Sequence, residues 1–155
     1  MLFDDCECIK SINFKKFYRN NVTNMGCMFY LCSSLKELNL SNFNTNNVTD
    51  MRNMFWGCSS LEELNLSNFN TNNVKNMEGM FYKCSSLKEL NLSNFNTNKD
   101  TYMRDMFNGC TSLKELNFNT NNVSNVEFMF LGCSAQFQNR MRAQYKDIIE
   151  EELHY

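Results

Sequence analysis

The chain is built on an internal repeat of 26 residues, and no other feature constrains its fold as strongly. The shorter last step has a visible cause, since ELNLSNFNTNNV at 63–74 becomes ELNFNTNNV at 115–123, with three residues fewer. Tandem repeats of this length are typical of solenoids, in which each unit buries its apolar side chains only against its neighbours. The repeat is marked by one cysteine in each unit, namely Cys6, Cys32, Cys58, Cys84, Cys110 and Cys133.

The first half of each unit has the hydrophobic spacing of a helix. In the unit that spans 46–71, Met51, Met54, Phe55 and Cys58 fall at i, i+3, i+4 and i+7, which places them on one helical face. Thr49 precedes this stripe, at the position where a helix N-cap is expected. The sequence therefore predicts a short helix in every unit.

The second half of each unit has the two-residue period of a strand. Leu64 and Leu66 alternate with Glu63 and Asn65, so one face of the strand is expected to be buried and the other exposed. Crossover connections between parallel strands are almost always right-handed. We therefore expect an α/β fold in which a right-handed solenoid carries a parallel β-sheet on one face and short helices on the other.

Two sequence patterns in the repeat resemble a known family. The spacing L-x-x-L-x-L followed by an Asn-rich turn resembles leucine-rich repeats, and the string NFNTNNVTDMRNMFWGCSSLEELNLS at 42–67 resembles the BspA-like leucine-rich repeat surface proteins. The resemblance covers about residues 1–133. It implies an open solenoid that is displayed on a cell surface and that takes part in adhesion or in the binding of partners. Since MLFDDCECIK has no signal-peptide pattern, the alternatives are a cytoplasmic location, an intracellular interaction scaffold or a fragment of a longer repeat protein.

The two ends of the chain depart from the repeat. We expect residues 1–133 to form the array, with a truncated first unit that begins inside the helical half. After Cys133 the period stops, and Phe137, Met141 and Tyr145 follow helical spacing. Residues 134–155 are therefore predicted to be a C-terminal amphipathic helix, over 135–153, that caps the last coil.

The composition argues against several functional classes. The net charge of −2 argues against binding to the phosphate backbone of a nucleic acid. No segment is long and apolar enough to insert into a membrane. The only histidine is His154, and no base lies near a nucleophile, so we expect no enzyme activity, no cofactor and no metal site. The repeated cysteines are expected to be buried thiols, whereas Cys27 lies outside the apolar stripe and is expected to be exposed and reactive.

The outward side chains of the predicted strands form the candidate binding surface. A protein or glycan is the expected partner, and the chain is expected to be a monomer or part of a longer array. Plain solubility and ladders of Asn side chains are the alternative explanation for the same residues. A second stripe, Tyr30, Trp56 and Tyr82, is expected either to pack between neighbouring units or to form a ridge for a protein partner. The candidate binding residues are Glu37, Asn39, Glu63, Asn65, Glu89, Asn91, Glu115 and Asn117.

Overall fold

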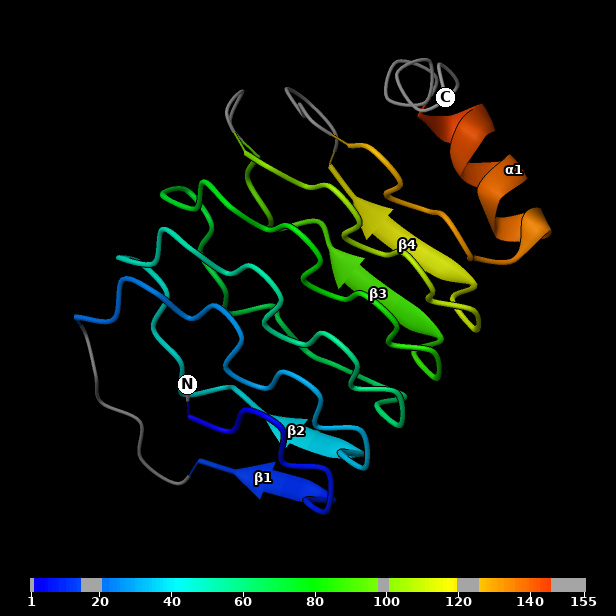
Figure 1. Ribbon diagram of the computed structural model, residues 1–155. Helices are drawn as coiled ribbons and strands as arrows, with labels where there is room; N and C mark the ends of the chain where they lie inside the picture. Colours follow the sequence, from blue (N-terminus) through cyan, green and yellow to red (C-terminus); the bar gives the residue numbers. More distant parts are fainter. Residues whose placement is uncertain (1, 15–20, 98–100, 120–125, 146–155) are drawn as a thin grey trace.

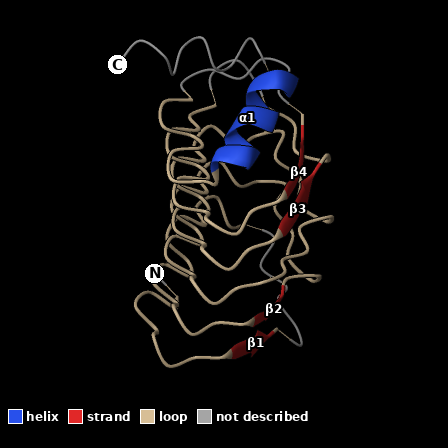
Figure 2. Cartoon of the chain, turned by 90° about the vertical axis from the view of Figure 1, so that its right-hand side faces the viewer, coloured by secondary structure: helices blue, strands red, loops and turns tan. Residues whose placement is uncertain are grey.

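The protein is a stack of similar coils, as the computed structural model shows for residues 2–14, 21–97, 101–119 and 126–145 (Figure 1). Each coil places a short extended segment on one side of the stack and a series of turns on the other, and the single described helix lies across one end (Figure 2). This arrangement agrees with the predicted repeat solenoid. It places each unit of sequence in contact only with the units before and after it.

Four short strands lie on the same side of the stack (Figure 2). They are β1 (Ser11–Asn13), β2 (Glu37–Asn39), β3 (Glu89–Leu92) and β4 (Glu115–Phe118). Strand β1 pairs with β2 and strand β3 with β4, both in parallel and both with partners one repeat apart. In β3, Glu89 and Asn91 are exposed while Leu90 and Leu92 are buried, so the predicted alternation is confirmed.

The expected single sheet is instead divided into two sheets of two strands each. Residues 61–66, which lie between β2 and β3 in the repeat, form no strand. The backbone bond from Lys88 N to Glu62 O is 3.4 Å long, whereas the equivalent bond from Lys114 N to Lys88 O is 2.8 Å long. This unit carries Glu62 where the other units carry a lysine, and the longer bond is the one that the Glu62 carbonyl accepts.

The predicted helices in the first half of each unit are wrong, because these segments are tandem turns. In the unit that begins near Met25, the N–H of Met28 donates to Met25 O and the N–H of Cys32 donates to Phe29 O, each across three residues. The third residue of each turn has a positive φ, which a helix does not allow but a type II turn requires. Two such residues, four positions apart, occur in each described unit from Cys27 onward: Cys27 and Leu31, Asn53 and Gly57, Gly79 and Lys83, Asp105 and Gly109, and Phe128 and Gly132.

The turns leave alternate N–H groups free to bond to the next unit. In one coil the N–H groups of Asn53 and Phe55 donate to the carbonyls of Glu78 and Met80, at 2.8 and 2.9 Å. A helix would satisfy these groups within its own segment, so a helical coil could not form this ladder. Thr49 is therefore not an N-cap; its hydroxyl donates to the carbonyl of Thr23 in the preceding unit, at 3.2 Å.

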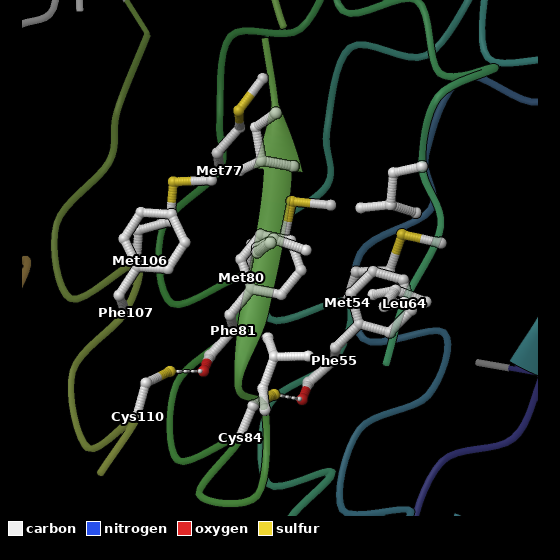
Figure 3. Packing of buried hydrophobic residues seen from close by; sticks show 14 of the residues in the cluster. Met54, Phe55, Leu64, Met77, Met80, Phe81, Cys84, Met106, Phe107 and Cys110 are labelled. Carbon is white, nitrogen blue, oxygen red and sulfur yellow. Dashed lines mark hydrogen bonds between the residues drawn. The ribbon is translucent and has the colours of Figure 1, made fainter. Parts of the chain in front are cut away.

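The core is a set of columns in which one residue type stacks on itself. Phe29, Phe55, Phe81 and Phe107 are fully buried, and successive rings lie 5.5–5.6 Å apart and nearly parallel. Methionine columns lie beside the rings, as Figure 3 shows for Met54, Met80 and Met106. The helical spacing thus identified the buried residues correctly, although it assigned them to the wrong secondary structure.

Helix α1 (Ala135–Gln144) follows the last coil. Its buried residues are Phe137 and Met141, and the ring of Phe137 meets that of Phe130 edge-on at 5.8 Å. The helix is shorter than the predicted 135–153, because the backbone of Tyr145 leaves the helical region, with φ of −126° and ψ of 58°. The remainder of the predicted helix, from residue 146 onward, lies outside the described residues.

Candidate functional site

All eight predicted binding residues are exposed on the strand side of the stack, and we call the surface that they form the strand face. Six of them lie on β2, β3 and β4, while Glu63 and Asn65 lie on the intervening segment that forms no strand. The register pairs Glu89 with Glu115 and Asn91 with Asn117, so like side chains face the same way in neighbouring units. Their side chains point away from the core, because Leu64, Leu90 and Leu116 between them are buried and Leu38 is half-buried.

The asparagines on this face have a structural role. The N–H of Ser41 donates to Oδ1 of Asn39 at 3.0 Å, and the same bond forms at Asn65 and at Asn91. Such side-chain bonds to the residue two positions later turn the chain at the end of a strand. The amide oxygens of these three asparagines are therefore engaged within their own units, which leaves the glutamates as the charged groups that the face presents.

The strand face is acidic over its middle units. A shallow concave region of about 680 Å³ is lined by four carboxylates and by one lysine, Lys36. An ion pair joins Glu62 to Lys88 of the next unit. The hydrogen bond and the charge of Lys88 hold the pKa of the Glu62 carboxyl below its usual value, and they raise the pKa of Lys88 in turn. The remaining carboxylates, Glu37, Glu63 and Glu89, give the region its negative charge.

Further asparagines hold the turns that leave the strand face, a role that the repeat pattern did not predict. The side-chain amide of Asn68 donates to the carbonyls of Leu40 and Phe43 in the preceding unit, at 3.1 and 2.9 Å. Asn94 makes the equivalent bonds one unit later. The signal for this role was the repeated string SNFNT, in which Asn42, Asn68 and Asn94 directly precede the buried Phe43, Phe69 and Phe95.

The repeated cysteines are buried thiols, as predicted, from Cys32 to Cys133, while Cys6 in the first unit is half-buried. The Sγ of Cys58, Cys84 and Cys110 each donates to a phenylalanine carbonyl of the preceding unit at 3.1 Å, and Figure 3 shows two of these bonds. Burial raises the pKa of Cys32 to about 11, and it raises the pKa values of Cys58, Cys84 and Cys110 further. These thiols are therefore protonated hydrogen-bond donors rather than nucleophiles.

Cys27 does not have the predicted character of an exposed, reactive thiol. It is half-buried, and burial raises its pKa above the ordinary value, which lowers its thiolate fraction at neutral pH. Cys8 is the exposed cysteine among the described residues. No group of three or more His, Cys, Asp and Glu side chains that could hold a metal ion occurs in the described part of the chain.

The aromatic stripe on the turn side packs between units, which is one of its two expected roles. The rings of Trp56 and Tyr82 stack at 3.7 Å between centroids, and Tyr30 stacks on Trp56 at 6.0 Å. Stacked rings cover one another's faces, so a ligand can reach mainly their edges. This geometry favours the strand face over the turn side as the functional surface.

Comparisons with known proteins agree with this architecture. A family model described as "Mycoplasma protein of unknown function, DUF285" matches residues 1–116 and, a second time, residues 88–148. None of the curated proteins matches the chain. The described residues contain no helix that is long and apolar enough to cross a membrane.

One solved structure shares the fold, and a second is a weaker match. A leucine rich cell surface protein from Faecalibacterium prausnitzii A2-165 is 21% identical, with a TM-score of 0.56 over 84% of this chain and 34% of that protein. A leucine-rich repeat protein from Bacteroides ovatus ATCC 8483 is 21% identical, with a TM-score of 0.46 over 74% of this chain and 27% of that protein. The chain thus spans about a third of the length of the first structure. The predicted resemblance to BspA-like leucine-rich repeat proteins is confirmed.

Proposed function

Because the chain belongs to the family described as "Mycoplasma protein of unknown function, DUF285" and has a leucine-rich repeat fold, we propose that it is a non-catalytic binding module. Its strand face holds a protein or glycan ligand. Solenoids offer extended surfaces of this kind, because each unit contributes the same side chains at a regular spacing.

The observation that carries this proposal is the register of the strand face. Glu89 lies opposite Glu115 and Asn91 opposite Asn117, on strands whose neighbours are spaced about 4.8 Å apart. A ligand that contacts one unit therefore meets the same chemistry in the next one. Since four carboxylates and one lysine line the concave middle region, the ligand surface that fits it carries basic groups or hydrogen-bond donors.

The proposed location of this module is a cell surface, where it takes part in adhesion. Support comes from the solved leucine rich cell surface protein that shares the fold. An intracellular interaction scaffold is the second candidate, and the exposed thiol of Cys8 favours it, since exposed thiols persist best in a reducing compartment. Titration of the thiols in freshly isolated native protein distinguishes the two, because oxidised or modified Cys8 is expected only on exported material.

Binding of the purified chain to arrays of immobilised glycans and basic peptides tests the proposed function. The double variant Glu63→Gln, Glu89→Gln removes two exposed charges at constant size. At about 0.2–1 kcal/mol for each exposed charge, we expect about a fivefold loss of affinity for a ligand of the strand face. Glu7→Gln is the matched control, since Glu7 is exposed in the first unit and not on this face.

Equal affinity of the double variant and the wild type would place the ligand elsewhere on the molecule. A hydrolase or transferase activity that survives purification and is lost in Glu89→Gln would show that the module is an enzyme.

A further inference from the structure

A second cavity lies where helix α1 meets the last coils of the stack. Its volume is about 580 Å³, within the range of about 300–1,000 Å³ that is usual for small-ligand sites. One wall comes from the coils that lead into β3 and β4, and the other comes from the first two turns of α1. The cavity is lined by Lys88, Thr111, Ser112, Leu113, Lys114, Glu115, Ser134, Gln136, Phe137 and Arg140.

The charge of this cavity is opposite to that of the middle of the strand face. Three basic side chains and one carboxylate line it, in a chain whose net charge is −2. Lys88 is engaged by Glu62, but Lys114 and Arg140 have no ion-pair partner among the described residues. No acidic residue lies in the first turn of α1 to compensate them. The basic groups of this cavity therefore attract an anionic ligand.

The remaining wall is rich in hydroxyl and amide groups. Thr111 donates its hydroxyl to the carbonyl of Ser85, which leaves the Thr111 oxygen as an acceptor toward a ligand. Ser134 accepts the N–H of Phe137 at 3.2 Å, so its own hydroxyl hydrogen can be donated. The guanidinium of Arg140 lies over the ring of Phe137 at 5.6 Å, which fixes the cation against the wall.

We propose that this cavity binds an acidic sugar residue. Lys114 and Arg140 take the carboxylate, while Thr111, Ser134 and the side-chain amide of Gln136 bind the hydroxyl groups of the ring. This site is separate from the acidic middle of the strand face, so the experiments on one site do not decide the other.

Chemical-shift titration of the ¹⁵N-labelled chain tests the proposal, with sodium glucuronate as the probe. D-Glucose has the ring without the carboxylate, and N-acetylglutamate has carboxylates without the ring. We expect glucuronate to shift the backbone signals of Lys114, Gln136 and Arg140 in a saturable manner, with at least tenfold weaker binding of the other two compounds. Binding should weaken with added NaCl, because exposed charges are screened.

Matched variants locate the site. Lys114→Gln and Arg140→Gln are each expected to weaken glucuronate binding at least tenfold, with the unfolding midpoint unchanged. Lys36→Gln is the control, since Lys36 occupies the position of Lys114 three units earlier but lies in the acidic region. Equal binding of N-acetylglutamate, equal binding of glucose, or no saturable shift at Arg140 overturns the proposal, as does an equal loss in Lys36→Gln.

Discussion

Replacing Gly79 with alanine tests whether the first half of each unit is a series of left-handed turns. Gly79 has a φ of +57°, and an added Cβ would clash with Oδ1 of Asn53 and lie 2.8 Å from the ring of Trp56. Both neighbours belong to the preceding unit, and the Trp56 ring is held by its stack on Tyr82. The added methyl group therefore strains the backbone and also presses on the contact between two coils.

The expected cost follows from these two effects. A side chain in the left-handed region costs about 1–2 kcal/mol, and the lower entropy of the unfolded chain offsets about 0.4–1 kcal/mol of it. Overpacking against Asn53 and Trp56 adds about 1–3 kcal/mol. We expect a net loss of about 2–3 kcal/mol, or a fall in Tm of about 4–12 °C for a chain of this size. In a helix the same substitution would stabilise the protein by about 1 kcal/mol, so the two structures predict opposite signs.

Urea unfolding, followed by circular dichroism and by the fluorescence of the single tryptophan, measures this effect. The matched control is Gly109→Ala. Gly109 has a φ of +77°, but its added Cβ meets the side chain of Lys83, which is exposed and can move aside. We expect only the backbone cost there, about 1 kcal/mol. A Gly79→Ala variant as stable as the wild type would refute the turn assignment, and equal losses in both variants would refute the steric argument.

Three further measurements test other parts of the structure. A thiol reagent should modify Cys8 readily in the native protein, and the five buried thiols only after unfolding in guanidinium; rapid modification of more than the exposed and half-buried thiols would contradict the packing. In an NMR titration the pKa of the Glu62 carboxyl should lie below its usual value in the wild type and should rise in Lys88→Gln. The ion pair therefore contributes at neutral pH and is lost as the pH falls through the lowered pKa. An equal pKa of Glu62 in the two proteins would show that the pair does not form in solution. Tyr145→Phe removes a bond of 2.9 Å to the carbonyl of Phe118 and should cost about 1–2 kcal/mol, with faster hydrogen exchange in α1; unchanged exchange would mean that this bond does not hold the helix.

The buried residues of this fold could be predicted from the sequence, because burial depends only on which positions repeat. Any regular coil of 26 residues brings Phe55 onto Phe81, and the stacked rings then bury each other whether the backbone is helical or not. The same reasoning predicted the alternation of Glu89 and Leu90, since a strand with one buried face has a period of two. Columns of identical residues are therefore strong evidence for contact between units.

The backbone of the turns could not be predicted from apolar spacing, because two tandem turns place residues i, i+3, i+4 and i+7 on one side much as a helix does. The sequence contained a signal against the helix, however. Two columns four residues apart each contain glycine, represented by Gly79 in the first and by Gly57 and Gly109 in the second, and Asn53 shares the first column with Gly79. A helix has one glycine-bearing position, at its C-terminal end. Glycine and asparagine in two columns instead indicate two left-handed residues in every unit.

The candidate site shows where function can be sought in a repeat of this kind. Several positions that recur from unit to unit are engaged in stacking, as the side-chain bonds of Asn68 and Asn94 to the preceding units show. Departures from the repeat are free of that constraint, so they change the surface without weakening the stack. Glu62, where other units have lysine, engages Lys88 of the next unit and so leaves Glu37, Glu63 and Glu89 to make the middle of the strand face acidic, and Arg140, which lies beyond the array, helps to make its end basic. In this chain the recurring Asn68 and Asn94 positions hold the fold, whereas the proposed ligand contacts come both from the recurring glutamates of the strand face and from Arg140, which lies outside the repeat.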